Sequence, residues 1–159
     1  DHGNFLPDMA GRPVFRAAQL SRWLLRWICG GQAILARWAP TTLVDLLLAS
    51  ARAGDVRLAE DPGFRSTMQT MLTLSLRNGA PGYRREVEAY VEPWAPLLAR
   101  ITAPVVIRHG THDNWAPPAM AKALAAALPN VTDFAMLPGH SHYSTLARTL
   151  ADLCDQRLS

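Results

Sequence analysis

The sequence predicts an α/β protein in which a long helical region precedes a short strand-helix-strand-helix unit. Three observations predict this class. Apolar residues recur at helical spacing before residue 93, two short strand-like runs follow residue 94, the first of them β-branched, and a helical segment separates those runs. Strands that alternate with helices are typical of a parallel sheet with right-handed crossovers. We therefore expect helices over residues 1–93 and a β-α-β-α unit over residues 94–159.

The first helical region is predicted from amphipathic spacing. Apolar and arginine residues occupy different faces over residues 14–28, and Gly30 and Gly31 are expected to end that helix. A short helical piece is expected over residues 33–38. The large apolar side chains of the helical region are predicted to be core residues: Trp23, Trp27, Trp38, Met68 and Met71.

Three further helices are predicted over residues 40–53, 62–77 and 81–92. Gly54 and Asp55 are expected to close the first of these helices. Asp61 is the expected N-cap of the second, because it directly precedes a proline at the first helical position. A proline begins the third helix and another proline stops it.

The C-terminal unit contains the predicted strands. A buried strand is expected at Val105-Val106-Ile107, before Gly110, and a second strand over residues 131–137. A helix rich in alanine over residues 117–128 separates the strands, and a last helix is expected over residues 144–157.

Composition and charge limit the classes of function. The chain has 159 residues, of which 49% are hydrophobic and 18% charged, as in soluble globular proteins. Its apolar stretches fall short of the roughly 18 residues that a membrane span needs, so no membrane partner is expected. The net charge is +3, but the basic residues are scattered, so we expect no nucleic-acid partner. Cys29 and Cys154 lack metal-ligand spacing and indicate reduced thiols in a cytoplasmic protein.

Ionisable side chains are concentrated in the two loops that follow the predicted strands. The first loop is HGTHDNWAPP over residues 109–118, and the second is LPGHSHY over residues 137–143. The carboxyl ends of parallel strands meet at one edge of a sheet, where ligands and catalytic groups are usually placed. The ionisable side chains of both loops are therefore expected at that edge.

These loops and their flanking residues resemble the end of α/β-hydrolase-fold enzymes. In that family the penultimate strand ends in a G-x-x-D turn and the last strand in a P-G-x-x-H turn, and here these are Gly110-x-x-Asp113 and Pro138-Gly139-x-x-His142. The run ITAPVVIRHG over residues 101–110 is also similar. The resemblance implies that Asp113 is the triad acid and His142 the general base. Ser141 stands where the family often has glycine.

The resemblance also implies a domain organisation and a reaction class. Residues 1–93 would be a helical lid, and residues 94–159 the C-terminal part of an incomplete α/β-hydrolase core. The implied activity is serine-type hydrolysis of an ester, thioester, amide or carbon-carbon bond in a small-molecule substrate, with no cofactor and no metal.

Neighbouring residues offer competing interpretations of the same loops. His140 could replace His142 as the base, but the family spacing favours His142. His109 and His112 are expected to be turn or pocket-rim residues, because no carboxylate or thiol completes a metal set at recognised spacing. Ser141 follows a strand and precedes a helix, as a nucleophile does, but Tyr143 stands where the elbow motif requires glycine.

The nucleophile itself is missing from the sequence, which contains no G-x-S-x-G. The chain also begins without an initiator Met, so we expect either a processed product or a part of a longer protein. The missing nucleophile and N-terminal half are expected upstream in a longer protein or on a complementary chain. Two parallel strands alone would leave sheet edges unpaired, so stable folding is expected to require those complementary strands. The isolated chain is expected to be inactive.

Two alternatives stay open. Dehalogenases and epoxide hydrolases of the same fold use an aspartate nucleophile and a histidine-activated water, and a difference of this kind would lie in the missing elbow. The second alternative is a non-catalytic fragment or interaction module, which the absent nucleophile suggests.

Overall fold

The computed structural model describes the backbone of residues 5–158 and the side chains of residues 5–155. Residues 1–4 and 159, which the predicted regions include, lie outside the described residues. The chain divides into two compact units. One contains both strands and comprises residues 5–9, Ala51–Leu58 and residues 94–158, and the other is helical and comprises Ala10–Ser50 and Ala59–Pro93.

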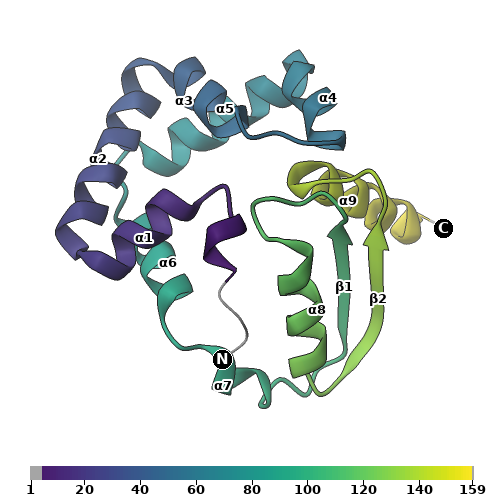
Figure 1. Cartoon of the computed structure of the whole chain (residues 1–159). Helices are drawn as coiled ribbons and strands as arrows, with labels where there is room; N and C mark the ends of the chain where they lie inside the picture. Colours follow the sequence, from purple (N-terminus) through teal and green to yellow (C-terminus); the bar gives the residue numbers. More distant parts are fainter. Residues whose placement is uncertain (1–4, 159) are drawn as a thin grey trace. The chain divides into compact units, whose positions relative to one another are not determined.

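The strand-containing unit has the predicted β-α-β-α order (Figure 1). Strand β1 (Val105–Gly110) pairs in parallel with β2 (Val131–Leu137), and helix α8 (Pro118–Ala127) connects them. Helix α9 (His142–Leu158) follows β2 and, like α8, contacts β1. Gly110 lies opposite Leu137 in the register, so the two strands end at the same edge. The remaining elements of this unit are the short helices η1 (Leu6–Asp8) and α7 (Ala95–Leu98) and the first part of α4 (Gly54–Glu60).

Apolar surface of this unit is uncovered in the described structure. The sheet has two strands among the described residues, and the side chains of Val106 and Phe134 on it are 58% and 37% exposed. On α9, Leu146, Leu150 and Leu153 recur at helical spacing and are all exposed. A parallel sheet is normally covered on both faces, so this surface is unusual for the fold class.

The helical unit is arranged around one long helix. Helix α2 (Arg22–Trp38) contacts α1 (Arg12–Leu20), α3 (Pro40–Leu48), α5 (Pro62–Leu76) and α6 (Pro81–Val91). One cluster of its core contains Leu25, Cys29 and Val87, and the other contains Ala36, Leu43 and Leu76. Asp61 caps α5 as predicted, since its Oδ1 accepts a hydrogen bond from the backbone N–H of Phe64 at 2.6 Å.

The prediction of one helix over residues 14–28 was wrong, because Ser21 separates two helices. Ser21 has extended backbone angles (φ −163°, ψ 124°), and its hydroxyl accepts a hydrogen bond from the backbone N–H of Leu24 at 3.4 Å. This is a local N-cap, which competes with continuation of the preceding helix. Apolar residues keep their helical spacing across Ser21, so the sequence pattern did not reveal the break.

The prediction that Gly30 and Gly31 end a helix was also wrong, since both lie inside α2. Glycine in a helix costs up to about 1 kcal/mol relative to alanine. Burial of Leu25 and Cys29 before the pair and of Ala36 after it offsets this cost. The predicted end of the helix over residues 40–53 was wrong as well, because α3 ends at Leu48. Gly54, which was expected to close that helix, begins α4.

Most of the predicted large core residues are exposed. The side chains of Trp23, Trp27, Trp38 and Met71 are 69%, 77%, 75% and 55% exposed, and Met68 is buried. Spacing identifies residues that share a helix face, but it does not show that another element covers the face. Within the described part of the chain, no helix is both long and apolar enough to cross a membrane.

Candidate active site

Asp113 is fixed in the turn that follows β1. Its Oδ1 accepts hydrogen bonds from the backbone N–H groups of Trp115 at 2.8 Å and of Ala116 at 2.9 Å. Aspartate commonly holds a turn in this way, by bonding to backbone groups two or three residues on. The residue is 5% exposed. The turn therefore uses one carboxylate oxygen and leaves Oδ2 for another partner.

That partner is His142, the first residue of α9. Its Nδ1 lies 2.9 Å from Asp113 Oδ2, and its side chain is 43% exposed. The two predicted residues come from loops 29 positions apart in the sequence and are brought into direct contact. Because Nδ1 faces the carboxylate, Nε2 is the ring nitrogen left to exchange a proton with a reactant.

The charge state of Asp113 determines the role of the histidine. Burial raises the pKa of the Asp113 carboxyl, but the hydrogen bond to His142, the backbone N–H groups of Ala116 and Trp115 and the attraction to His142 outweigh burial. The net pKa lies below the ordinary value of 3.8. Asp113 is therefore a carboxylate at neutral pH and can only accept, so Nδ1 carries the proton. A neutral His142 then has its basic lone pair on Nε2.

The start of α9, which carries His142, is anchored by Asp55. The Asp55 carboxylate is 1% exposed, and it accepts hydrogen bonds from the backbone N–H groups of Tyr143 at 3.1 Å and Ser144 at 2.7 Å. These bonds satisfy two donors of the first helical turn, where a negative charge is also favoured by the helix dipole. The backbone N–H of Gly54 donates to Gly139 O at 3.0 Å and joins the same segments.

Sequence reasoning missed Asp55, which was expected to close a helix. Its contacts with Tyr143 and Ser144 join positions 88 and 89 residues apart. No local pattern marks such a contact. The available signal was weak: an acidic residue beside a glycine, in a region otherwise predicted to be a helix end.

Close packing holds the two loops together behind the Asp113 and His142 pair. A β-carbon on Gly110 would lie 2.5 Å from His140 O, 2.7 Å from His140 C and 2.6 Å from Thr145 Oγ1. Real β-carbons do not approach backbone atoms so closely. The backbone N–H of His112 also donates to His140 O at 3.0 Å. Position 110 therefore requires glycine, because the backbone of the second loop lies too close to leave room for a β-carbon.

Ser141 has the contacts of a structural residue. It is completely buried, and its hydroxyl donates to the backbone carbonyl of His112 at 3.2 Å. Its backbone N–H donates to Ser144 Oγ at 2.8 Å. A nucleophile has to be exposed toward a substrate and bonded to the base, and the hydroxyl of Ser141 meets neither requirement.

The other three histidines of the two loops bond within their own loops. His109 Nε2 lies 2.8 Å from Ala116 O and 3.7 Å from Asp113 Oδ2, and His140 Nδ1 lies 3.0 Å from Pro138 O. His112 Nδ1 lies 2.9 Å from Thr111 Oγ1. Among the residues whose side chains are described, no three His, Cys, Asp or Glu side chains are grouped as metal ligands would be.

Two aromatic rings lie beside the imidazole of His142. The Tyr143 ring packs edge-on with the ring centroids 5.2 Å apart, and the centroid of the Trp115 ring lies 6.3 Å from that of the imidazole.

No protein-family model, curated protein or solved structure was found to match the chain. What the site can do is therefore inferred from its own geometry: a buried carboxylate orients a half-exposed imidazole, the arrangement that general acid–base catalysis requires.

Proposed function

We propose that this chain supplies the acid and the general base of a hydrolase of the α/β-hydrolase type. The observation that supports this most is the 2.9 Å contact between Asp113 Oδ2 and His142 Nδ1, with the aspartate buried and the imidazole half exposed. The order of the two residues along the chain and their position at the ends of neighbouring parallel strands agree with the same function.

In this mechanism Nε2 of His142 removes a proton from a hydroxyl nucleophile as it attacks the substrate. The carboxylate of Asp113 holds the imidazole in the tautomer that carries its proton on Nδ1, so that Nε2 is ready to accept a proton. It also stabilises the imidazolium that forms. His142 then returns the proton to the leaving group. The proposed substrate is a small molecule with an ester, thioester, amide or carbon-carbon bond.

The nucleophile would come from polypeptide outside the 159 residues, since the sequence has no G-x-S-x-G. The same polypeptide would supply strands that pair with the sheet. The exposed apolar side chains of Val106 and Phe134 support this, because a complete core would cover them. Residues 1–93 would then be the lid and residues 94–159 the end of the core, and the isolated chain would be inactive.

The test is ester hydrolysis by the natural protein that contains this chain, with fluorophosphonate labelling as a second readout. We expect His142→Ala to lower kcat by about 10⁶-fold and Asp113→Asn by about 10⁴-fold, since each removes a member of the proton-transfer pair. His140→Ala is the matched control, because it removes an imidazole two residues away that bonds within its own loop. Equal activity of the His142→Ala variant and the wild type would rule out the proposed base.

The same experiment separates the alternatives. With an aspartate nucleophile, the protein would not react with the fluorophosphonate, but hydrolysis of an epoxide or haloalkane would still depend on His142. A non-catalytic module would show neither reaction nor any dependence on His142.

A further inference from the structure

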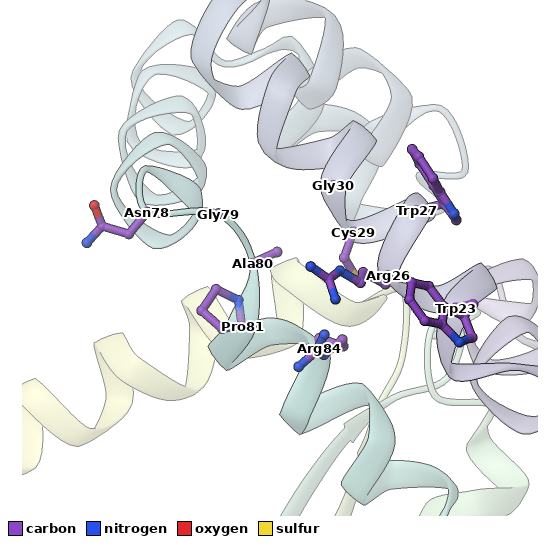
Figure 2. A pocket seen from close by; sticks show the side chains of 10 residues that line it. All are labelled: Trp23, Arg26, Trp27, Cys29, Gly30, Asn78, Gly79, Ala80, Pro81 and Arg84. Carbon is purple, nitrogen blue, oxygen red and sulfur yellow. The ribbon is translucent and has the colours of Figure 1, made fainter.

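The helical unit contains a groove that the proposed hydrolase chemistry does not use. It has a volume of about 730 Å³ and is lined by residues of α2, among them Trp23, Arg26, Trp27 and Gly30. The segment that leads into α6 and Arg84, in the first part of α6, complete the lining. Figure 2 shows the Arg26 side chain extending from α2 toward Ala80 and Pro81, with Arg84 close to it at the beginning of α6. Pockets for small ligands typically have volumes of about 300–1,000 Å³.

The groove has an excess of positive charge. A second hollow shares Trp23, Arg26 and Arg84 with it and adds Arg22 and Glu88, which gives three arginines and one glutamate. Glu88 Oε1 is 3.7 Å from the Nε atoms of both Arg22 and Arg84. One carboxylate is therefore shared between two guanidinium groups at distances longer than a hydrogen bond.

Arg84 has one N–H group that forms no hydrogen bond. Its Nε is inaccessible to solvent and forms no hydrogen bond with any described residue. The Glu88 carboxylate lies 3.7 Å from this Nε, and the Arg84 side chain as a whole is 37% exposed. An oxyanion is the acceptor that a guanidinium binds best, so an anion in the groove would meet the exposed part of Arg84.

Arg26 is held in position by an aromatic ring. Its guanidinium carbon lies 5.8 Å from the centroid of the Trp23 ring, within the range of a cation–π contact. A stacked guanidinium keeps the N–H donors along its edge free to bind a carboxylate or phosphate. The indoles of Trp23 and Trp27 are 69% and 77% exposed and offer flat apolar surfaces beside the two arginines.

We propose that this groove binds a planar aromatic anion, in which a carboxylate or phosphate meets Arg26 and Arg84 and the ring stacks against Trp23. Two guanidinium groups from different helices give selectivity for the oxyanion, and the indole gives selectivity for the ring. All of these residues belong to the helical unit. The proposed site does not include Asp113 or His142, so a failure of either proposal would leave the other unaffected.

The chain offers a matched pair of variants to test the groove. A β-carbon on Gly30 or on Gly31 would have no atom within 4 Å, and both glycines lie inside α2. Gly30 lines the groove, whereas Gly31 is not among its described lining residues. Gly30→Glu and Gly31→Glu therefore make the same change in charge and helix propensity, but only the first places a carboxylate in the groove.

Binding of 2-naphthoate to the natural protein that contains this chain would be measured by calorimetry, with 2-naphthyl phosphate in a second series to distinguish the two oxyanions. We expect 2-naphthoate or 2-naphthyl phosphate to bind, and neutral 2-naphthamide and ring-free acetate to bind at least about tenfold more weakly. Gly30→Glu and Arg26→Gln should each weaken binding by about tenfold or more, and Gly31→Glu should bind like the wild type. Thermal melts would establish that the variants are folded.

Three results would overturn the proposed site: binding of 2-naphthamide as tight as that of both anions, equal affinities of Gly30→Glu and Gly31→Glu, or no binding of either aromatic anion.

Discussion

The site of Asp113 and His142 at the strand ends (the strand-end site) and the groove lined by Trp23, Arg26 and Arg84 (the arginine–tryptophan groove) use glycine in opposite ways. At the strand-end site, a β-carbon on Gly110 would lie 2.5 Å from a backbone oxygen, and one on Gly54 would lie 2.7 Å from Ser144 Oγ. In the groove region, β-carbons on Gly30 and Gly31 would meet no atom within 4 Å. The first site is closed around backbone hydrogen bonds, and the second is open to solvent.

This difference indicates two different requirements. The proposed proton-transfer pair needs an imidazole and a carboxylate held within a few tenths of an ångström, which close packing of the supporting loops favours. The proposed binding groove needs unoccupied volume and donors that an anion can reach. Substitutions that add a methyl group or remove a charge should therefore have opposite effects in the two regions.

The largest effect on stability is expected from Gly110→Ala. The added β-carbon would overlap His140 O and Thr145 Oγ1, so the second loop has to move, at a cost of about 3 kcal/mol of unfolding free energy. Equilibrium urea unfolding of the purified protein would measure this cost. Gly82→Ala in α6 is the control, because its β-carbon would meet no atom within 4 Å. Equal stabilities of the two variants would show that the strand-end loops are not closely packed.

The second effect is expected from Asp55→Ala, which removes the carboxylate that caps α9. Loss of two charge-assisted hydrogen bonds in a buried place should lower the unfolding free energy by about 2 kcal/mol. Asp61→Ala removes the exposed cap of α5 and should cost about 1 kcal/mol.

Amide hydrogen exchange would locate the effect of Asp55→Ala. The backbone N–H groups of Tyr143 and Ser144 should exchange faster in that variant and be unchanged in Asp61→Ala. Unchanged exchange of both amides in Asp55→Ala would contradict the anchoring role of Asp55.

A smaller effect is expected in the acid dependence of stability. The pKa of Asp113 is lower in the folded protein than its ordinary value of 3.8, so the folded state binds the proton less readily than the unfolded state. The contribution of Asp113 to stability is therefore fully present above about pH 4 and is lost as the pH falls through the folded pKa. Urea unfolding of the wild type and Asp113→Asn between pH 2 and pH 6 would measure it. The wild type should lose more stability than the variant on acidification, and parallel profiles would contradict the assignment.

The smallest effect, and the one of opposite sign, is expected from Gly31→Ala. Alanine favours the helix by about 0.5–1 kcal/mol over glycine, and nothing within 4 Å would oppose its methyl group. The thermal midpoint should therefore rise. A lower midpoint would indicate that α2 is packed more tightly at this point than the open space suggests.

Much of the strand-containing unit could be predicted from the sequence. The second strand was predicted over the residues that form β2, because Pro129-Asn130 precedes that run and Pro138-Gly139 follows it. Parallel strands end at one edge, which placed both loops together, and the family resemblance singled out Asp113 and His142, which the structure brings into contact. These signals come from residues close together in the sequence, so they can be recognised without the structure.

Other features could not be predicted in this way. The exposure of Trp23 and Trp27 depends on whether another element covers that face of α2, and spacing along the helix is the same in both cases. The continuity of α2 through Gly30 and Gly31 depends on packing of Leu25, Cys29 and Ala36 on either side. Tertiary contacts overrode the local preference in both cases.

The sequence by itself determined the β-α-β-α order, because that order follows from turn chemistry and the spacing of apolar residues, and the family resemblance singled out Asp113 and His142. Tertiary structure alone decided that Asp55 anchors α9 from 88 residues away and that two arginines from different helices share one groove. The physical reason is that hydrogen bonds, charge and burial act through space. Residues far apart in the chain can therefore form one site without any pattern in the sequence between them.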